Sequence, residues 1–239
     1  MAPLSLEQLE ELKRYSTPTV CNAIELFEVR PRNEGFMLPT IVCRFPELPV
    51  CVGYAATATF RAAEPAPPGK EVSLEAYYEH ILSLPAPRIL VAQDLDPQPL
   101  GALFGEVNAT LHQALGCVGH ITNGGVRDLE ECRALGFHFF SGCVLVSHAY
   151  VHLEGFGEPV QVGGVTVRPG DLIHADRHGV CLIPQEVAPR LAEACAIVEA
   201  LERPLLELAR SSEFTPARYA EARRAFRRQW QEWVERLKG

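Results

Sequence analysis

The chain has 239 residues, of which 47% are hydrophobic, and this is enough to bury one substantial core. Its 30 acidic residues outnumber its 22 lysines and arginines, so the net charge is −8, which disfavours a nucleic-acid partner. No apolar run reaches the length of a membrane span, and the N-terminus lacks the basic-then-apolar pattern of a signal peptide. We therefore expect a cytoplasmic protein without a membrane partner.

Two short helices are predicted at the start of the chain. Ser5-Leu6-Glu7-Gln8 has the pattern of a capping box, and Thr17 is predicted to cap a second helix with Pro18 in its first position. The next predicted elements are a winding connection with one short strand over Arg30–Leu48, a strand over Val50–Phe60, a helix over Ser73–Leu84, a buried strand over Arg88–Ala92 and a polar loop over Gln93–Leu100.

A helix, a strand and a glycine turn are predicted in the middle of the chain. Val107–Leu115 has apolar residues at the 3–4 spacing of a half-buried helix, and Gly116 should end it. Cys117–Ile121 is predicted to be a short strand, after which Asn123-Gly124-Gly125 should turn the chain. The apolar face of the helix is predicted to consist of Val107, Leu111, Ala114 and Leu115.

The last part of the chain is predicted to contain strands and then two helices. Pro204 should end or kink the first of these helices. The predicted elements are one or two strands over Phe137–Val146, a hairpin over residues 161–166, a strand pair over Asp171–His174 and Gly179–Ile183, a helix over Glu186–Ala209 and a last helix over Ala217–Leu237. This order predicts an α/β fold. We expect one α/β domain over residues 1–210, with residues 211–239 as its C-terminal helical extension.

The last predicted helix carries a cluster of arginines. Acidic residues interleave with Arg223, Arg224, Arg227 and Arg228, which favours a solvated or subunit-facing helix over one that binds nucleic acid.

Two pairs of neighbouring residues outline a small-molecule site. Gly105 and Glu106 suit a loop whose backbone N–H groups bind an anion at a helix N-terminus, and Arg127 and Asp128 follow about twenty residues later. An anion-binding loop, a cation and a carboxylate together predict a small-molecule site. The alternatives are that Asp128 only caps the next helix and that Glu106 is an acid favoured by the helix dipole.

A second spacing is typical of a metal pair only on a helix. His148 and His152 lie in an apolar, strand-like run, where four residues separate them by about 13 Å. This distance argues against a shared metal ion.

The two pairs resemble the motif of a known family, that of the class II, metal-dependent 4-hydroxy-4-methyl-2-oxoglutarate/4-carboxy-4-hydroxy-2-oxoadipate aldolases. The family also includes the regulator of ribonuclease activity A. In the aldolases a glycine and an acidic residue precede Arg-Asp by about twenty residues; Asp is commoner than Glu at the acidic position. The resemblance extends over roughly Ser16–Arg210, with further matching stretches at residues 16–20, 52–58, 165–171 and 175–184.

The resemblance implies a fold and a reaction. The fold would be a β/β/α layered, swivelling-domain-like α/β domain that assembles as a homotrimer or homohexamer. The reaction would be retro-aldol cleavage of a small 4-hydroxy-2-oxo acid to pyruvate, with decarboxylation of oxaloacetate as a related activity. The cofactor would be a divalent cation, Mg²⁺ or Mn²⁺.

The resemblance also implies roles for individual residues. Asp128 would hold the metal, and Arg127 would bind the keto oxygen of the substrate. Glu106 would orient a water that takes the proton of the C4 hydroxyl and returns one to the enolate. A glutamate from a neighbouring subunit would complete the site, and Glu202 matches its place better than Glu199. Backbone N–H groups for the substrate carboxylate would come from Gly105, Glu106, Val107 and Asn108.

Two other functions are compatible with the same sequence. One is a non-catalytic regulator that binds ribonuclease machinery, although members of that branch typically lack the aspartate that is present here as Asp128. The other is an enzyme acting on a sugar acid or hydroxy acid with the same metal site.

Overall fold

The computed structural model describes residues 3–237, which fall into two compact units. The sheet unit is Gly35–Ile183, and the helical unit combines Pro3–Glu34 with the chain from Pro184 on. The division expected at residue 210 stays a prediction. Residues 1–2 and 238–239, which the expected bounds include, lie outside the described part.

The sheet unit alternates strands with three helices. Its elements are β1 (Val42–Cys43), β2 (Cys51–Arg61), α3 (Leu74–Ser83), β3 (Arg88–Asp94), β4 (Ala102–Phe104), α4 (Glu106–Ala114), β5 (Cys117–Val126), α5 (Leu129–Ala134), β6 (His138–Val144), β7 (His152–Phe156), β8 (Val160–Val162), β9 (Val165–Val167), β10 (Leu172–Asp176) and β11 (Gly179–Ile183).

Five strands of the main sheet, β2 to β6, form parallel pairs. The sheet has nine strands, and its path runs β1-β6-β5-β3-β2-β10-β11, with β4 added to β5 and β7 added to β2. The pairs β2–β3, β3–β5, β5–β6 and β4–β5 are parallel, whereas the pairs that involve β1, β7, β10 and β11 are antiparallel. The carboxyl ends of the parallel strands therefore meet at one edge of the sheet, where open α/β sheets commonly bind ligands.

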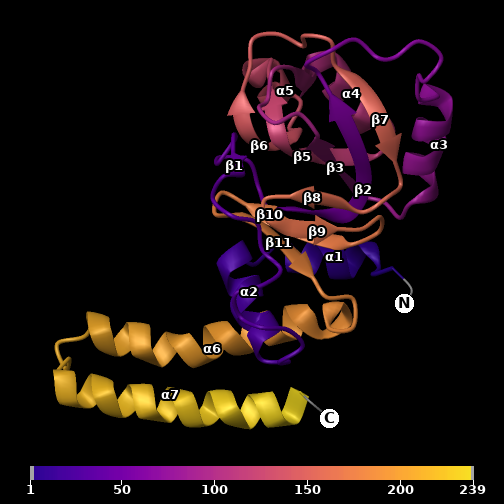
Figure 1. Ribbon diagram of the computed structural model, residues 1–239. Helices are drawn as coiled ribbons and strands as arrows, with labels where there is room; N and C mark the ends of the chain where they lie inside the picture. The colour runs from indigo at the N-terminus through magenta and orange to yellow at the C-terminus, as the bar shows by residue number, and fades with distance from the viewer. Residues whose placement is uncertain (1–2, 238–239) are drawn as a thin grey trace. The chain divides into compact units, whose positions relative to one another are not determined.

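Each face of the sheet has its own core. Helices α4 and α5, in the upper part of Figure 1, and α3, at its right, contribute Ala109, Cys132 and Tyr77 to a buried cluster with Phe60. The opposite face forms a second cluster, in which Ile89 and Ile121 pack against the β8–β9 hairpin and β10. A layer of helices and a layer of strands thus cover the two faces, and the predicted α/β class is confirmed.

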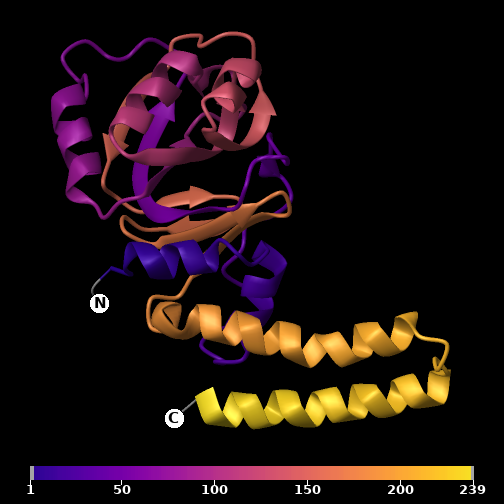
Figure 2. The same ribbon diagram turned by 180° about the vertical axis from the view of Figure 1, so that it is seen from behind.

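The helical unit is built around a long helical hairpin. Its elements are α1 (Leu6–Leu12), α2 (Thr17–Glu25), the 3-10 helix η1 (Ala188–Arg190), α6 (Leu191–Arg210) and α7 (Pro216–Leu237). Helices α6 and α7 lie side by side (Figure 2), and Arg190 before α6 donates from Nη1 to the carbonyl of Leu237 at 3.2 Å. Within the described residues, no helix combines the length and apolar character needed to span a membrane.

The predicted helix starts were right at α1 and wrong at α2, and of the two effects predicted for Pro204 the structure excludes one, the end of the helix. The capping box of Ser5 and Gln8 is confirmed by reciprocal bonds of 3.2 and 2.9 Å. The cap of α2 is Ser16 rather than Thr17, because Ser16 has extended backbone and its Oγ accepts from the Thr19 N–H. Pro204 does not end α6, since buried residues on both sides of it offset a cost of about 3 kcal/mol for an interior proline.

The predicted glycine turn after Ile121 is part of strand β5. The Asn123 side chain bonds both backbone groups of Asp94 on β3, at 2.8 and 2.9 Å, and so keeps the strands paired. Gly124 and Gly125 are required by close neighbours rather than by a turn. A Cβ would lie 2.8 Å from the Phe60 ring at Gly124 and 2.5 Å from Leu145 at Gly125.

The predicted apolar face of α4 is right at Leu111 and Leu115, which are half-buried, and wrong at Val107 and Ala114, which are exposed. Ala109 and His112 are the buried residues of this helix, whereas the Val107 side chain is 81% exposed. A histidine in the core explains the error, because hydropathy alone assigns it to the solvent face.

Candidate functional site

Two neighbouring parallel strands place the predicted site residues together. Strand β4 ends just before Gly105, and β5 ends just before Arg127. The Arg127 N–H donates to the Phe104 carbonyl at 2.9 Å, so that the two strand ends stay paired beyond the ladder. Gly105 and Asp128 consequently come into contact although they are far apart in the sequence.

The Asp128 carboxylate is seated against the N-terminus of α4. Its Oδ2 accepts from the Glu106 N–H at 2.9 Å, and a Cβ at Gly105 would lie only 2.1 Å from this oxygen. Only glycine leaves room for the carboxylate at this distance. Asp128 does not cap α5 with its side chain, and its φ is +52°, a left-handed conformation that is uncommon for aspartate and typical of functional sites.

Arg127 lies beside the carboxylate and is open to a ligand. Its Nε is 3.7 Å from Asp128 Oδ2, and the two side chains are 36% and 37% exposed. A planar guanidinium can bind a carboxylate or an enolate oxygen through two parallel N–H groups. The pair thus offers a cation and a carboxylate side by side.

These residues surround one cavity of about 320 Å³. The structure brings Arg127 and Asp128 together there with the N-terminus of α4, and their chemical roles stay predictions. The lining residues are Ala102, Leu103, Gly105, Val107, Asn108, Arg127, Asp128, His148 and Val151. The cavity is large enough for a small acid and its hydration water.

Two predicted catalytic residues do not line this cavity. Glu106 is exposed and contributes its backbone N–H to Asp128, while its carboxylate is not among the lining groups. Glu202 and Glu199 belong to the helical unit, on α6. There Glu202 Oε1 accepts from Asn22 Nδ2 at 3.4 Å.

His148 also lines this cavity, although the sequence predicted no metal-binding role for it. The chain from Leu145 to Val151 forms a loop after β6, not the expected continuous strand, and this loop carries His148 to the cavity. One feature of the sequence could have indicated His148: it follows a strand of the parallel part of the sheet, β6, by a few residues. His152 begins β7 and lines a different cavity.

The residues present fit a magnesium or manganese ion that keeps most of its water. Residues 3–237 contain no group of three His, Cys, Asp or Glu side chains arranged as a metal cage. Asp128 is the one carboxylate that lines the cavity, and its Oδ1 makes no hydrogen bond among the described residues. Mg²⁺ is commonly held by one or two carboxylates together with water and substrate oxygens.

A buried pair, Tyr77 and His112, is hydrogen-bonded to the first turn of α4 at Asn108. His112 Nδ1 donates to the Asn108 carbonyl at 2.8 Å, and its Nε2 accepts from the Tyr77 hydroxyl at 2.9 Å. Burial lowers the pKa of His112 to about 4, so the ring is neutral, as these bonds require. Asn108 in turn donates from Nδ2 to the Leu103 carbonyl at 2.6 Å, which fixes the cavity wall.

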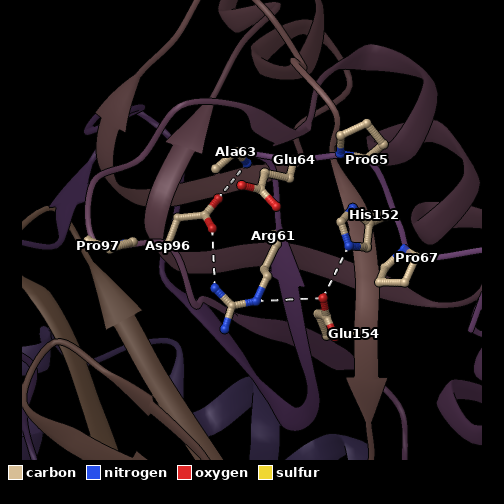
Figure 3. Close-up of a pocket in the computed structure, with 9 residues that line it drawn as sticks. All are labelled: Arg61, Ala63, Glu64, Pro65, Pro67, Asp96, Pro97, His152 and Glu154. Carbon is tan, nitrogen blue, oxygen red and sulfur yellow. Dashed lines mark hydrogen bonds and ion pairs between the residues drawn. The ribbon is translucent and has the colours of Figure 1, made fainter.

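A second cavity of about 440 Å³ lies at the same edge of the sheet and is held by ion pairs (Figure 3). Arg61 reaches Asp96 on one side at 3.4 Å and Glu154 on the other at 3.6 Å, and His152 Nε2 is 3.1 Å from Glu154. The Asp96 side chain is 3% exposed and also accepts the N–H groups of Ala62 and Ala63. This network fixes the chain after β2 and β3.

A comparison with models of protein families identifies one family. The model of the family described as RraA-like, Aldolase/RraA, matches residues 17–182. A protein of Halalkalibacterium halodurans, provisionally named 4-hydroxy-4-methyl-2-oxoglutarate aldolase, is 30% identical over 113 residues, which cover 47% of this chain and 51% of that protein. The chain spans about half or less of the length of the curated relatives that it matches.

Solved structures share the fold. An uncharacterised protein of Pseudomonas syringae pv. tomato has a TM-score of 0.72 at 22% identity, covering 94% of this chain and 96% of that one. RraAS2 of Streptomyces coelicolor, described as an unusual member of the RNase ES inhibitor RraA protein family, has a TM-score of 0.67 at 22% identity, covering 85% and 97%. The matches confirm the family resemblance seen in the sequence and the fold class.

Proposed function

The chain belongs to the RraA-like family, and on this premise we propose that it is a divalent-metal-dependent lyase that cleaves 4-hydroxy-2-oxo acids to pyruvate. The name of the Halalkalibacterium relative supports this reaction class. We include decarboxylation of oxaloacetate, because both reactions produce the enolate of pyruvate.

The observation that carries the proposal is the contact between Asp128 and the Gly105–Glu106 turn beside Arg127. A metal-dependent lyase requires a carboxylate in its cavity to hold the metal ion. A regulator that only binds another protein does not require one. The cation, Mg²⁺ or Mn²⁺, would be held by Asp128 and, when bound, would stabilise negative charge on the 2-oxo acid.

The other residues of the cavity bind and orient the substrate in this proposal. Arg127 donates to the keto oxygen, whose negative charge grows as the carbon–carbon bond breaks. The backbone N–H groups of Val107 and Asn108, in the first turn of α4, receive the substrate carboxylate. Glu106, next to Asp128, orients a water molecule at the mouth of the cavity.

The proposal includes a contribution from a second copy of the chain. We propose a homotrimer or homohexamer in which Glu202, or Glu199 in its place, completes the site of a neighbour. Val107 is 81% exposed beside the cavity, a position at which a neighbouring subunit would cover apolar surface.

An assay for pyruvate release tests the proposal directly. Purified protein is incubated with oxaloacetate and with a panel of 4-hydroxy-2-oxo acids, including 4-hydroxy-4-methyl-2-oxoglutarate. We expect release that EDTA abolishes and Mg²⁺ restores. Asp128→Ala should lose turnover by orders of magnitude, and the matched control Glu130→Gln, on the exposed first turn of α5, should not. Undiminished turnover in metal-free protein would contradict the proposal.

A further inference from the structure

The loop after β6 is fixed in place by backbone contacts. The Ala102 N–H donates to the Ser147 carbonyl at 2.9 Å, and the Tyr150 N–H donates to the Ala62 carbonyl at 3.1 Å. A Cβ at Gly101 would lie 2.3 Å from the His148 carbonyl, so a glycine is needed for this close approach. The loop therefore has a defined position against β4.

The turn that presents His148 is strained. Ala149 has φ +47°, in the left-handed region that non-glycine residues rarely adopt, and its N–H donates to Ser147 Oγ at 3.0 Å. Such a conformation persists where the surroundings impose it, often at functional sites. Here it accompanies a histidine that lines the candidate site.

A hydrogen bond to the main chain orients the ring of His148. Its Nδ1 lies 2.7 Å from the Ala149 carbonyl, which can only accept, so Nδ1 carries the hydrogen. The lone pair of the neutral ring is then on Nε2, which has no hydrogen-bond partner among the described residues. An imidazole in this state is ready to accept a proton.

The other groups at the cavity are less suited to this task. The Arg127 guanidinium has only N–H donors, and Asp128 is the residue proposed to hold the metal. The Glu106 carboxylate does not line the cavity. Apart from Asp128, which is proposed to hold the metal, His148 is thus the lining side chain that offers a free lone pair.

We infer that His148 is the base that takes the proton of the C4 hydroxyl during retro-aldol cleavage, an inference that rests on the proposed function. His148 Nε2 accepts this proton, the C4–O bond becomes a carbonyl, and the C3–C4 bond breaks. The electron pair of that bond forms the enolate of pyruvate. The imidazolium then gives its proton to C3, which yields pyruvate and restores the neutral ring. No oxidant or further reactant is consumed.

Two substrates separate this role from a structural one. Cleavage of 4-hydroxy-4-methyl-2-oxoglutarate requires removal of the hydroxyl proton, whereas decarboxylation of oxaloacetate has no such proton to remove. We expect His148→Ala to lower kcat for cleavage by about 10²–10⁴-fold, the usual contribution of a general base, and to change decarboxylation by less than about threefold. Added imidazole should restore part of the cleavage rate only. His178→Ala, whose ring is 55% exposed in the same unit, serves as the matched control.

Each outcome of this experiment decides the assignment. Equal losses on both substrates, a change in KM alone, or a cleavage rate that stays native would overturn it while the proposed function stands. Wild-type protein that releases pyruvate from neither substrate, or from oxaloacetate alone, would refute the proposed retro-aldol reaction and the role of His148 with it. Selective loss with rescue by imidazole would support both.

Discussion

Two buried histidines should make the sheet unit lose stability at mildly acidic pH. Burial lowers the pKa of His112 to about 4 and that of His120 to about 3, the latter with a smaller contribution from the nearby His112. His120 is fully buried and stacks on Phe104 at 4.0 Å between ring centroids. In the unfolded chain both rings titrate near their ordinary value of about 6.5.

The sign and size of the effect follow from proton linkage. Because the folded pKa values are depressed, the unfolded chain binds more protons below pH 6.5, and stability falls as the pH falls. Between pH 7.5 and 5.5 each histidine should lower the free energy of unfolding by about 1.3 kcal/mol, or about 2.7 kcal/mol together. Asp94 acts in the opposite direction, because burial raises its pKa to about 6 and its protonation favours the folded state by about 0.8 kcal/mol over this range. The net contribution of these three groups is a loss of about 2 kcal/mol.

Hydrogen exchange of the β5 amides is the suitable assay. Tryptophan fluorescence would report on the wrong unit, since both tryptophans, Trp230 and Trp233, lie on α7. His112→Gln and His120→Leu should each remove about 1.3 kcal/mol of the pH-dependent loss, whatever they do to stability at pH 7.5. His178→Gln should leave the loss unchanged. A double variant that still lost about 2 kcal/mol on acidification would refute the reasoning.

Three further substitutions test the site and its support. Gly105→Ala should displace the Asp128 carboxylate, because the new Cβ would lie 2.1 Å from Oδ2. Titration calorimetry should then show Mg²⁺ binding weaker by at least about tenfold, as is usual when the support of a metal ligand is lost, and native affinity would contradict this. Arg127→Lys should lower kcat for pyruvate release by about 10²–10³-fold, because an ammonium lacks the planar pair of donors, and a change in KM alone would make Arg127 a ground-state binding residue. Asp96→Ala should lower the free energy of unfolding, measured by urea denaturation, by about 2–3 kcal/mol. The reason is that its 3%-exposed carboxylate accepts two backbone N–H groups and pairs with Arg61, and an unchanged midpoint would count against that role.

Patterns of local sequence were enough to predict the elements that lie near the site. The alternation in Val50–Phe60 predicted β2, and the glycine before Glu106 together with Arg127 and Asp128 predicted where an anion-binding loop meets a cation and a carboxylate. These signals are short-range, because strand alternation and helix starts depend on neighbouring residues.

Features set by long-range contacts could not be predicted in the same way. The Asn123-Gly124-Gly125 segment has the composition of a turn, and only its packing against Asp94, Phe60 and Leu145 makes it a strand. Similarly, His148 is brought to the cavity by contacts of its loop with Ala102 and Ala62. Because a single sequence does not show which segments contact each other, the position of His148 at the cavity could not be predicted.

The division of the predicted site residues between two units leads to a test of shared sites. Asp128 lies in the sheet unit, and Glu202 lies on α6 of the helical unit, where Asn22 donates to its Oε1 at 3.4 Å. If Glu202 serves the site of a neighbouring subunit, Asp128→Ala and Glu202→Ala should each be inactive, yet a reassembled 1:1 mixture should recover activity. In a closed ring each site combines residues from two neighbours, so random mixing leaves roughly a quarter of the sites with both native residues. Pyruvate release near this fraction of the wild-type rate, with each unmixed variant as control, would support the assembly and the role of Glu202 together. A mixture that stays inactive after subunit exchange has been demonstrated would mean that both residues act within one chain or that Glu199 has this role, and Glu199→Ala in place of Glu202→Ala distinguishes these two cases.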